Sequence, residues 1–266
     1  MRSLKNRVVW VTGASSGIGE ALTYELAKSG ARIIISARRK EELEKVKGNC
    51  DAASQPNIRI LPLDLAAANT LKLSVQAAMQ TFGHIDILIN NGGVSQRSLA
   101  LDTSLEVDRK IMEVNYFGTI ALTKYLLPYM INQKGGHIAV VTSLTGKFGT
   151  PYRSGYAAAK HALHGFFESL RAELWKQNIK VTILAPGFIQ TTVSVSALTG
   201  DGTPLNKMDD AQNNGMPVKK CAKQIIKAIV NQKEEVYIGG KETLGVHFKR
   251  FFPGLFSKMI RKAKVR

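Results

Sequence analysis

The sequence has few of the features that mark secreted, membrane-spanning or disordered proteins. Its only two cysteines, Cys50 and Cys221, form no CxxC pair, no disulfide framework and no metal-ligand spacing, so we expect free thiols in a reducing cytosol. No apolar run approaches the about 20 residues of a membrane-spanning helix. The most apolar windows, 85–89 and 181–184, have the length of strands. The apolar residues at 8–11, behind a basic N-terminus, are too few for a signal peptide, whose apolar stretch has about 7 to 15 residues.

Acidic residues are also scarce, with 20 Asp and Glu against 37 Lys and Arg and a net charge of +17. So basic a protein meets polyanions readily, and nucleic acid, an anionic membrane and phosphorylated ligands are all candidate partners. Otherwise the composition is that of a globular protein, with 44% hydrophobic residues in a chain of 266. No Pro/Gly/Ser-rich linker divides the first 190 residues. We therefore expect one domain over residues 1–240, with a mobile substrate lid at 188–217, and a basic, aromatic extension over 241–266.

Short β-branched runs alternate along the chain with longer amphipathic stretches, a pattern that predicts βα units. Several runs are apolar nearly throughout, as in strands covered by helices on both faces. The predicted fold is therefore α/β, a doubly wound, seven-stranded parallel sheet. The expected strands are 8–11, 32–36, 58–61, 85–89, 137–142, 180–184 and 235–238. The expected helices are 17–28, 40–47, 69–82, 103–131, 154–177 and 219–231, with Gly30 and Gly48 as C-terminal caps.

A glycine-rich turn, TGASSGIG at residues 12–19, follows the first expected strand and opens the first helix. Gly13 permits the tight exit from the strand, Gly17 lets the backbone approach a pyrophosphate, and Gly19 lets the helix lie close to the sheet. The free N–H groups of the helix N-terminus favour an anion there. This context predicts a Rossmann dinucleotide site; a merely flexible loop is the alternative.

The residue that would bind the adenosine ribose gives a second signal. In such folds an acidic residue about 20 positions after the turn usually selects NAD, whose ribose has a free 2′-hydroxyl. Here that place is taken by Ala37, followed by Arg38 and Arg39. Two guanidiniums suit a 2′-phosphate, so the sequence favours NADP over NAD. The alternative is that both arginines only begin a solvated helix.

A candidate catalytic group lies after the fifth expected strand. Ser143 precedes Tyr156 by thirteen residues, and Lys160 follows Tyr156 by four, which places the last two on one helix face. A phenol ionises near pH 10, and lowering its pKa by about 3 units takes roughly 4 kcal/mol, which the neighbouring ammonium could supply. The alternative is a buried tyrosine beside a solvent-exposed lysine.

Six ordered motifs over roughly residues 4–240 together resemble the short-chain dehydrogenase/reductase family in its shorter, NADP-preferring form. They are TGASSGIG, Asn90-Asn91-Gly92-Gly93, Asn115, Ser143, Tyr156-x-x-x-Lys160 and Pro186-Gly187. The chain departs from the family where Gly92 replaces the usual alanine, which affects local backbone stiffness.

The resemblance implies a catalytic tetrad. Tyr156 would protonate the carbonyl oxygen, Lys160 would lower the pKa of the phenol and hold the nicotinamide ribose, and Ser143 would orient the carbonyl. Asn115 would hold a water that links Lys160 to solvent. Asp64 would bind adenine, Asn91 would touch the adenosine ribose and stabilise the central strand, and Ile189 and Thr191 would hold the carboxamide. The other implied NADP(H)-binding residues are Gly13, Ser15, Ser16, Gly17, Ile18, Gly19, Arg38, Arg39, Leu65, Gly92, Pro186 and Gly187.

His161 and His164 are three residues apart, a spacing compatible with metal, but we expect no acidic or cysteine partner to join them. We therefore predict no metal site and place both on the helix surface where the family often pairs subunits. A homodimer or homotetramer is the expected assembly.

The extension carries eight Lys or Arg against one Glu, interleaved with four phenylalanines. This composition suits a segment at an anionic membrane surface, interrupted by Pro253-Gly254. The alternative is that the rings cover the substrate cleft or a neighbouring subunit. Nucleic acid is the weaker interpretation, because no recognised binding module accompanies the charge. The four rings belong to Phe248, Phe251, Phe252 and Phe256.

Together these features predict an NADPH-dependent carbonyl reductase or alcohol dehydrogenase acting on a small ketone or aldehyde with an apolar body. The apolar side chains expected near the cleft are Val94, Leu144, Phe148, Phe188 and Val193. The alternatives are a 3-oxoacyl thioester reductase of lipid metabolism and a non-catalytic, membrane-recruited NADP-binding regulator. The expected location is cytoplasmic, with peripheral membrane contact through the extension as a further option.

Overall fold

The central feature of the computed structural model, which describes residues 3–263, is one seven-stranded parallel sheet. Its strand order, β3-β2-β1-β4-β5-β6-β7, confirms the predicted doubly wound fold. The strands are β1 (Val8–Thr12), β2 (Arg32–Ser36), β3 (Ile58–Ile60), β4 (Ile87–Asn90), β5 (Gly136–Val141), β6 (Ile179–Pro186) and β7 (Glu235–Ile238).

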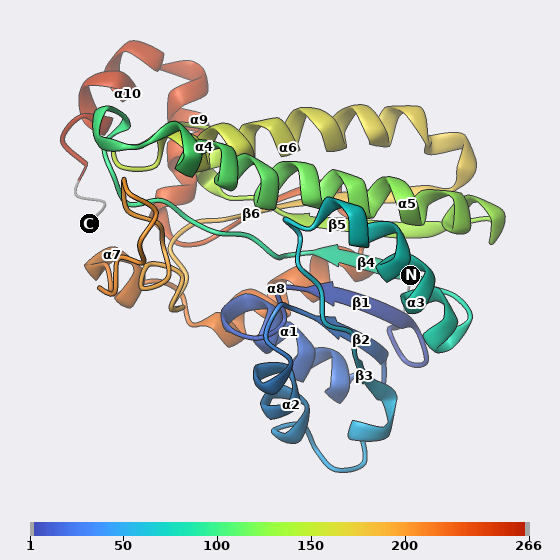
Figure 1. The fold of residues 1–266 in the computed structure, drawn as a ribbon. Coiled ribbons are helices and arrows are strands. Elements are labelled where there is room, and N and C mark those ends of the chain that lie inside the picture. The colour runs from blue at the N-terminus through green and yellow to red at the C-terminus, as the bar shows by residue number, and fades with distance from the viewer. Residues whose placement is uncertain (1–2, 264–266) are drawn as a thin grey trace.

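Alternate residues of each strand enter two separate hydrophobic cores, because successive side chains point to opposite faces of a sheet. In β1, Val9 and Val11 face one core, while Val8 and Trp10 face the other. The buried Trp10 indole donates to Ser36 Oγ at 2.8 Å, so its polar atom is satisfied. Figure 1 shows the two helix layers that close these cores. They are α1 (Gly17–Lys28), α2 (Lys40–Gly48) and α8 (Val218–Val230) on one face, and α3 (Ala68–Phe82), α5 (Gly118–Asn132) and α6 (Ser154–Glu173) on the other.

The strand order reverses between β1 and β4, and this switch point positions the site. Strands β2 and β3 lie on one side of β1. The chain then crosses to the other side, where β4 lies next to β1 and is followed by β5, β6 and β7. Loops that leave the carboxyl ends of β1 and β4 therefore diverge and open a crevice, where ligands of such sheets bind.

The long helix expected over residues 103–131 is wrong as one element. It is divided into α4 (Leu105–Met112) and α5 by a π-helical turn at Glu113–Phe117, which closes with a bond from the Gly118 N–H to the Glu113 carbonyl. Turns of this kind inside helices are frequent at functional sites, and this one holds Asn115.

Other boundaries differ by smaller amounts. The helix expected to reach residue 177 ends at Glu173, because a 3-10 turn at Trp175–Gln177 and a left-handed Asn178 lead into β6. Gly48 is the last residue of α2 rather than its cap, a place taken by Asn49. Both cysteines are free and buried.

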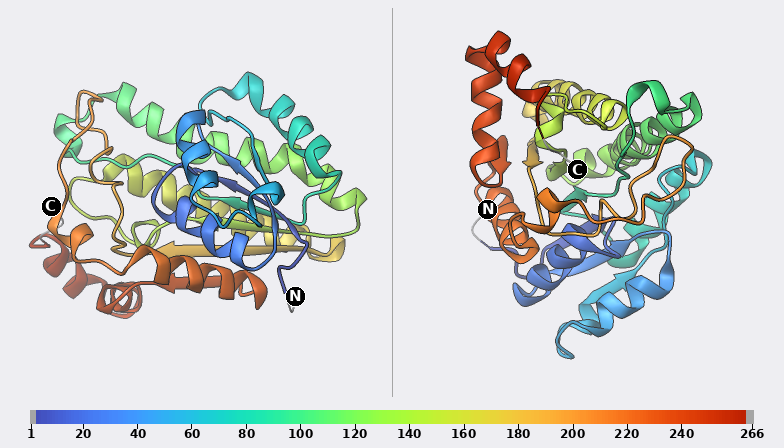
Figure 2. Two further views of the ribbon diagram at one scale, coloured as in Figure 1. Left: turned by 90° about the horizontal axis from the view of Figure 1, so that it is seen from below. Right: turned by 90° about the vertical axis from the view of Figure 1, so that its left-hand side faces the viewer.

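Two regions outside the βα rhythm lie at the carboxyl end of the sheet. The segment 188–217 holds only the short helix α7 (Asp210–Asn213) and isolated bridges, one of which joins Gln96 to Leu198. The extension forms two helices, α9 (Leu244–Phe251) and α10 (Pro253–Ile260). No helix or strand was predicted there from the sequence. Both helices stand out at one end of the molecule, far from α2 and β3 (Figures 1 and 2).

Candidate active site

One cavity of about 1250 Å³ runs along the crevice at the carboxyl ends of the strands. Almost every site residue predicted from the sequence borders it. Those residues are Gly13, Ser15, Ser16, Gly17, Ile18, Arg38, Arg39, Asp64, Leu65, Asn91, Gly92, Ser143, Tyr156, Lys160, Pro186, Gly187, Ile189 and Thr191. Gly19 and Asn115 are not part of the lining and lie buried behind it.

The N-terminus of α1 forms one end of the cavity. Its N-cap residue, Ser16, makes no side-chain cap bond, so the first N–H groups of the helix are left for a ligand. Gly17 has φ +57°, and a Cβ there would come within 3.2 Å of the Thr191 methyl. Glycine is therefore needed both for the left-handed turn and for its close approach to the opposite wall.

The replacement of alanine by Gly92 has a packing reason in this chain. A Cβ at this position would lie 2.7 Å from Leu65 Cδ1, so the Leu65 side chain takes the space that a methyl would fill. Beside it, the Asn91 amide donates to the carbonyls of Thr12 (3.0 Å) and Gly13 (3.2 Å). Asn91 thus ties the end of β4 to the glycine-rich turn.

The adenosine end of the cavity has no carboxylate directly after β2. Ser36 and Ala37 line it there, followed by the exposed guanidinium side chains of Arg38 and Arg39. Asp64, after β3, also borders the cavity, and its Oδ1 accepts the N–H of Ala66 at 3.0 Å. The edge of the cavity next to β2 therefore carries the positive charge of two arginines.

Tyr156, in the first turn of α6, lies at the middle of the cavity beside Ser143. The pKa of the phenol lies above its ordinary value, because burial raises it by more than the charge of Arg97, the hydrogen bond from Ser143 and the charge of Arg153 lower it. Ser143 follows β5, and its Oγ accepts the N–H of Thr145 at 3.2 Å. The phenol and the hydroxyl that the spacing predicted are thus brought together.

Two buried arginines near Tyr156 were not found from the sequence. Arg97 Nε lies 2.6 Å from Asp209 Oδ2, and Arg153 Nη2 lies 3.3 Å from the same oxygen. All three residues are buried, and both arginines line the cavity. Burial, followed by the charge of Arg97, lowers the pKa of Arg153 to about 10. No local spacing could reveal this group, because Arg97 and Asp209 are 112 residues apart.

Gln96 connects the same region to the start of α6. Its Oε1 accepts the backbone N–H groups of Gly155 at 2.8 Å and Tyr156 at 3.2 Å. Its amide donates to Thr103 Oγ1 at 2.9 Å. Gln96 therefore fixes the helix turn that carries Tyr156, a role with no sequence signal.

Lys160 is buried one turn further along α6. Its Nζ donates to the Val141 carbonyl at 2.9 Å and lies 5.6 Å from the centre of the Tyr156 ring. Burial lowers the pKa of this amine to about 8.

Asn115 lies on the π-helical turn and makes two hydrogen bonds to the backbone of Val94. Its Oδ1 accepts the Val94 N–H at 2.8 Å, and its Nδ2 donates to the Val94 carbonyl at 2.9 Å. It thereby holds the loop that follows β4.

The loop after β6 is held by residues of the 188–217 segment. Gln212 is buried, and its amide donates to the Ile189 carbonyl and to Thr191 Oγ1. Further along the cavity the lining becomes apolar. The five apolar residues expected near the cleft, Val94, Leu144, Phe148, Phe188 and Val193, all border it.

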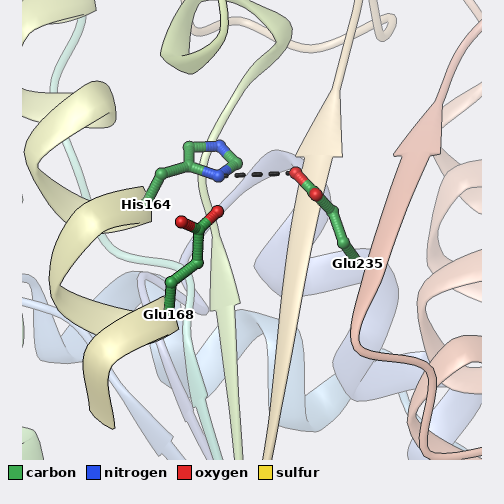
Figure 3. A group of neighbouring side chains, drawn as sticks. All are labelled: His164, Glu168 and Glu235. Carbon is green, nitrogen blue, oxygen red and sulfur yellow. Dashed lines mark ion pairs between the residues drawn. The ribbon is translucent and has the colours of Figure 1, made fainter. Parts of the chain in front are cut away.

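The two histidines of α6 differ in environment, and the expected surface position of His164 is wrong. His161 is exposed, whereas His164 is buried and its Nε2 lies 3.0 Å from Thr142 Oγ1. Figure 3 shows His164 facing Glu235, at 3.5 Å from Nδ1 to Oε1, with Glu168 beside them. Burial, then the charge of Lys147, lowers the pKa of His164 to about 3.

The expectation that no acidic partner joins the histidines is wrong for His164. Within the described residues, His164, Glu168 and Glu235 bring ligand atoms within 4.8 Å of one another. Lys147 Nζ lies in the same group, 2.7 Å from Glu235 and 3.4 Å from Glu168. An ammonium therefore supplies the positive charge that these carboxylates require.

Fold and cavity together define the class of the protein, an oxidoreductase that uses a nicotinamide nucleotide. A glycine-rich helix N-terminus and a Ser-Tyr-Lys group share one cavity at the switch point of a parallel sheet. The model of the short chain dehydrogenase family matches residues 7–201, and the chain belongs to that family.

Relatives along most of the chain support this assignment. The chain is 46% identical to "Dehydrogenase/reductase SDR family protein 7-like" of Anopheles gambiae over 242 residues, covering 89% of this chain and 76% of the relative. It is 44% identical over 249 residues to human "Dehydrogenase/reductase SDR family member 7" (92% and 74%). It is 38% identical over 263 residues to bovine "Dehydrogenase/reductase SDR family member 7B" (97% and 81%).

Solved structures share the fold. A short-chain dehydrogenase from Streptomyces avermitilis superposes with a TM-score of 0.81 at 26% identity, covering 97% of this chain and 98% of that one. A short-chain dehydrogenase/reductase from Burkholderia phymatum, solved in complex with NAD, gives 0.84 at 20% identity, with 96% of each chain covered. Among the described residues, no helix combines the length and apolar character that crossing a membrane requires.

Proposed function

We propose that this protein is an NADPH-dependent carbonyl reductase or alcohol dehydrogenase whose substrate is a ketone or aldehyde with an apolar body. The observation that carries the proposal is the continuous cavity. It joins the glycine-rich turn to Tyr156 and continues into a wall of apolar side chains. Nucleotide and substrate would meet beside the one phenol placed to exchange a proton.

The residues present fit NADP(H). The N-terminus of α1 suits the pyrophosphate, and the two guanidinium groups of Arg38 and Arg39 suit a 2′-phosphate that a carboxylate would repel. Asp64 and Asn91 would lie against the adenosine, while Ile189 and Thr191 would hold the carboxamide. Bound NADPH supplies the hydride.

The protein contributes the proton and the orientation. In the reductive direction the Tyr156 hydroxyl gives its proton to the carbonyl oxygen, while the Ser143 hydroxyl donates to the same oxygen and aligns it. In the oxidative direction the phenolate takes the proton of the alcohol. Lys160 would hold the nicotinamide ribose, and a water held at Asn115 would return protons from solvent to Lys160.

Substitution of the phenol tests the reaction. Tyr156→Phe removes only the proton donor, so NADPH binding should stay close to wild type while turnover falls by about 100-fold or more. The assay is NADPH oxidation over a panel of ketones, aldehydes, quinones, steroids and acyl thioesters. Tyr24→Phe, on α1 and outside the cavity, is the matched control and should keep full activity. Wild-type turnover by Tyr156→Phe would overturn the assignment.

Cofactor preference is tested by titrating NADPH and NADH by fluorescence. NADPH should bind at least about tenfold tighter, a difference of about 1.4 kcal/mol, within reach of one charge-assisted phosphate contact. Arg38→Gln/Arg39→Gln should abolish the difference by weakening NADPH alone. Lys40→Gln, at the next exposed position but outside the cavity, should leave it unchanged. Equal affinities in the wild type would refute the preference.

The proposed assembly is a homodimer or homotetramer formed through α5 and α6. The exposed face of α5 carries Tyr125 and Tyr129, each 38% exposed and one helical turn apart. Aromatic side chains at this spacing form a continuous strip that a second copy could cover. We propose a cytoplasmic location for the enzyme.

A further inference from the structure

The helices α9 and α10 present an apolar strip to solvent. Phe251, at the end of α9, is 71% exposed, and Leu255 and Met259, one turn apart on α10, are 57% and 49% exposed. Phe252 (54%) and Leu244 (65%) extend the strip. We call these five side chains, with the basic residues around them, the tail surface.

The tail surface is exposed although both helices are anchored. Phe256 is buried, with its ring centre 5.1 Å from that of Phe148 and 6.2 Å from that of Phe248. Lys249 Nζ also donates to the Lys147 carbonyl at 2.6 Å. The four phenylalanines of the extension therefore divide in two: Phe248 and Phe256 hold the helices to the protein, while Phe251 and Phe252 face outward.

Positive charge surrounds this strip. Six basic side chains, all exposed, belong to the described part of the extension: Lys241, Lys249, Arg250, Lys258, Arg261 and Lys262. Its one acidic residue, Glu242, is turned inward, where its carboxylate accepts the N–H groups of Phe188 at 3.3 Å and Gly240 at 3.0 Å. The outer side of the extension is thus basic and apolar.

The same helices form the mouth of the cavity. Leu244, Phe248, Phe256, Met259 and Ile260 all border it, and two of them, Leu244 and Met259, are also exposed members of the tail surface. The apolar lining of the cavity is therefore continuous with the apolar strip outside.

We propose that the tail surface docks on the interface of an anionic phospholipid bilayer, with the mouth of the cavity facing the lipid. Acyl chains accept the exposed rings and leucines, and anionic headgroups pair with the basic side chains around them. The two helices project at one end of the molecule (Figures 1 and 2), so a flat surface can reach them. A second copy of this chain is a poor occupant, because six basic groups would face six others.

This docking goes beyond the proposed reaction and does not depend on it. If the enzyme does reduce apolar ketones, the arrangement would let a membrane-dissolved substrate enter the cavity directly from the lipid.

The experiment is sedimentation of the full-length chain with vesicles. The wild type should bind vesicles of mixed phosphatidylcholine and phosphatidylserine, bind pure phosphatidylcholine much less, and be released by salt. Phe251→Ser/Leu255→Ser and, separately, Lys258→Glu/Arg261→Glu should each weaken binding by about tenfold or more. None of these four residues borders the cavity.

Matched controls lie on other elements. Leu73→Ser, on α3 at a position 65% exposed, and Lys72→Glu/Lys219→Glu should bind like the wild type. Turnover of a water-soluble ketone, measured without vesicles, should stay unchanged in all tail variants, which separates docking from catalysis.

Two results would overturn the proposal. One is a wild type that ignores anionic vesicles even at low salt. The other is a set of tail variants that change the oligomeric mass by light scattering without changing vesicle binding, because the tail surface would then be an interface between copies.

Discussion

At the scale of single residues, opposing effects act on the pKa of Tyr156, the proposed acid-base group. Burial raises the pKa of Tyr156, while two guanidiniums and the Ser143 hydroxyl lower it. From the sequence, the expected pKa is a lowered one, with Lys160 as its cause. In the structure the lowering comes from Arg97, Ser143 and Arg153, whereas Lys160 directs its ammonium to the Val141 carbonyl.

Residue-level prediction from sequence succeeded where chemistry is encoded by short spacings. Tyr156 and Lys160 are one turn apart on a helix, so their common border on the cavity followed from periodicity. Arg97, Asp209 and Gln212 gave no such signal, because they meet only after the 188–217 segment folds back over the crevice.

The buried Lys160 should make stability depend on pH in a defined direction. Its folded pKa is about 8 against an ordinary 10.5, so between these pH values the unfolded chain binds more protons than the folded one. The free energy of unfolding of the cofactor-free wild type should therefore rise with pH across this window, relative to Lys160→Met, by about 3 kcal/mol. Below pH 8 the difference between the two proteins should be flat.

Urea unfolding at a series of pH values measures this effect. The comparison with Lys160→Met cancels the titration of other groups, such as Cys221, whose pKa is raised by burial to about 12 and acts in the opposite direction. Lys72→Met, at an exposed position, should run parallel to the wild type. Parallel curves for the wild type and Lys160→Met would contradict the assignment.

At the scale of elements, the expected order and type of all seven strands match the structure, whereas some helix ends do not. Amphipathic periodicity passes smoothly through residues 113–117, and nothing in it marks a π-helical turn. That turn shifts the register of α5 relative to α4 and holds Asn115 against Val94. The helices of the extension were missed because each has only eight residues and Pro253-Gly254 interrupts the pattern between them.

A buried carboxylate, that of Asp209, ties the 188–217 segment to Arg97 and Arg153. Asp209→Ala removes the oxygen that lies between Arg97 and Arg153, and leaves their like charges to repel one another. We expect a loss of about 3 kcal/mol in the free energy of unfolding. We also expect much faster limited proteolysis within 188–217. Asp210→Ala, at the neighbouring exposed position, is the matched control and should resemble the wild type. Unchanged proteolysis of Asp209→Ala would show that the segment is held by other contacts.

At the scale of the whole molecule, the faces of the sheet provide stability and its carboxyl edge provides the candidate site. The helix layers on its faces build the cores, and the loops at its carboxyl edge build the cavity. The doubly wound architecture could be predicted because several strands are apolar nearly throughout, a pattern typical of parallel sheets that helices cover on both faces. The placement of the extension over the cavity could not, because it depends on contacts between Phe148 and Phe256, more than 100 residues apart.

Assembly is the remaining property at this scale. If copies pair through α5, Tyr125→Asp/Tyr129→Asp buries two carboxylates against an apolar partner face, so light scattering should report a monomer where the wild type is a dimer or tetramer. The melting temperature of the wild type should rise with protein concentration, and that of the variant should not. Trp175→Asp, at a position 67% exposed outside α5 and α6, controls for the added charge and should assemble normally. An unchanged mass for the double variant would move the interface to another surface of the molecule.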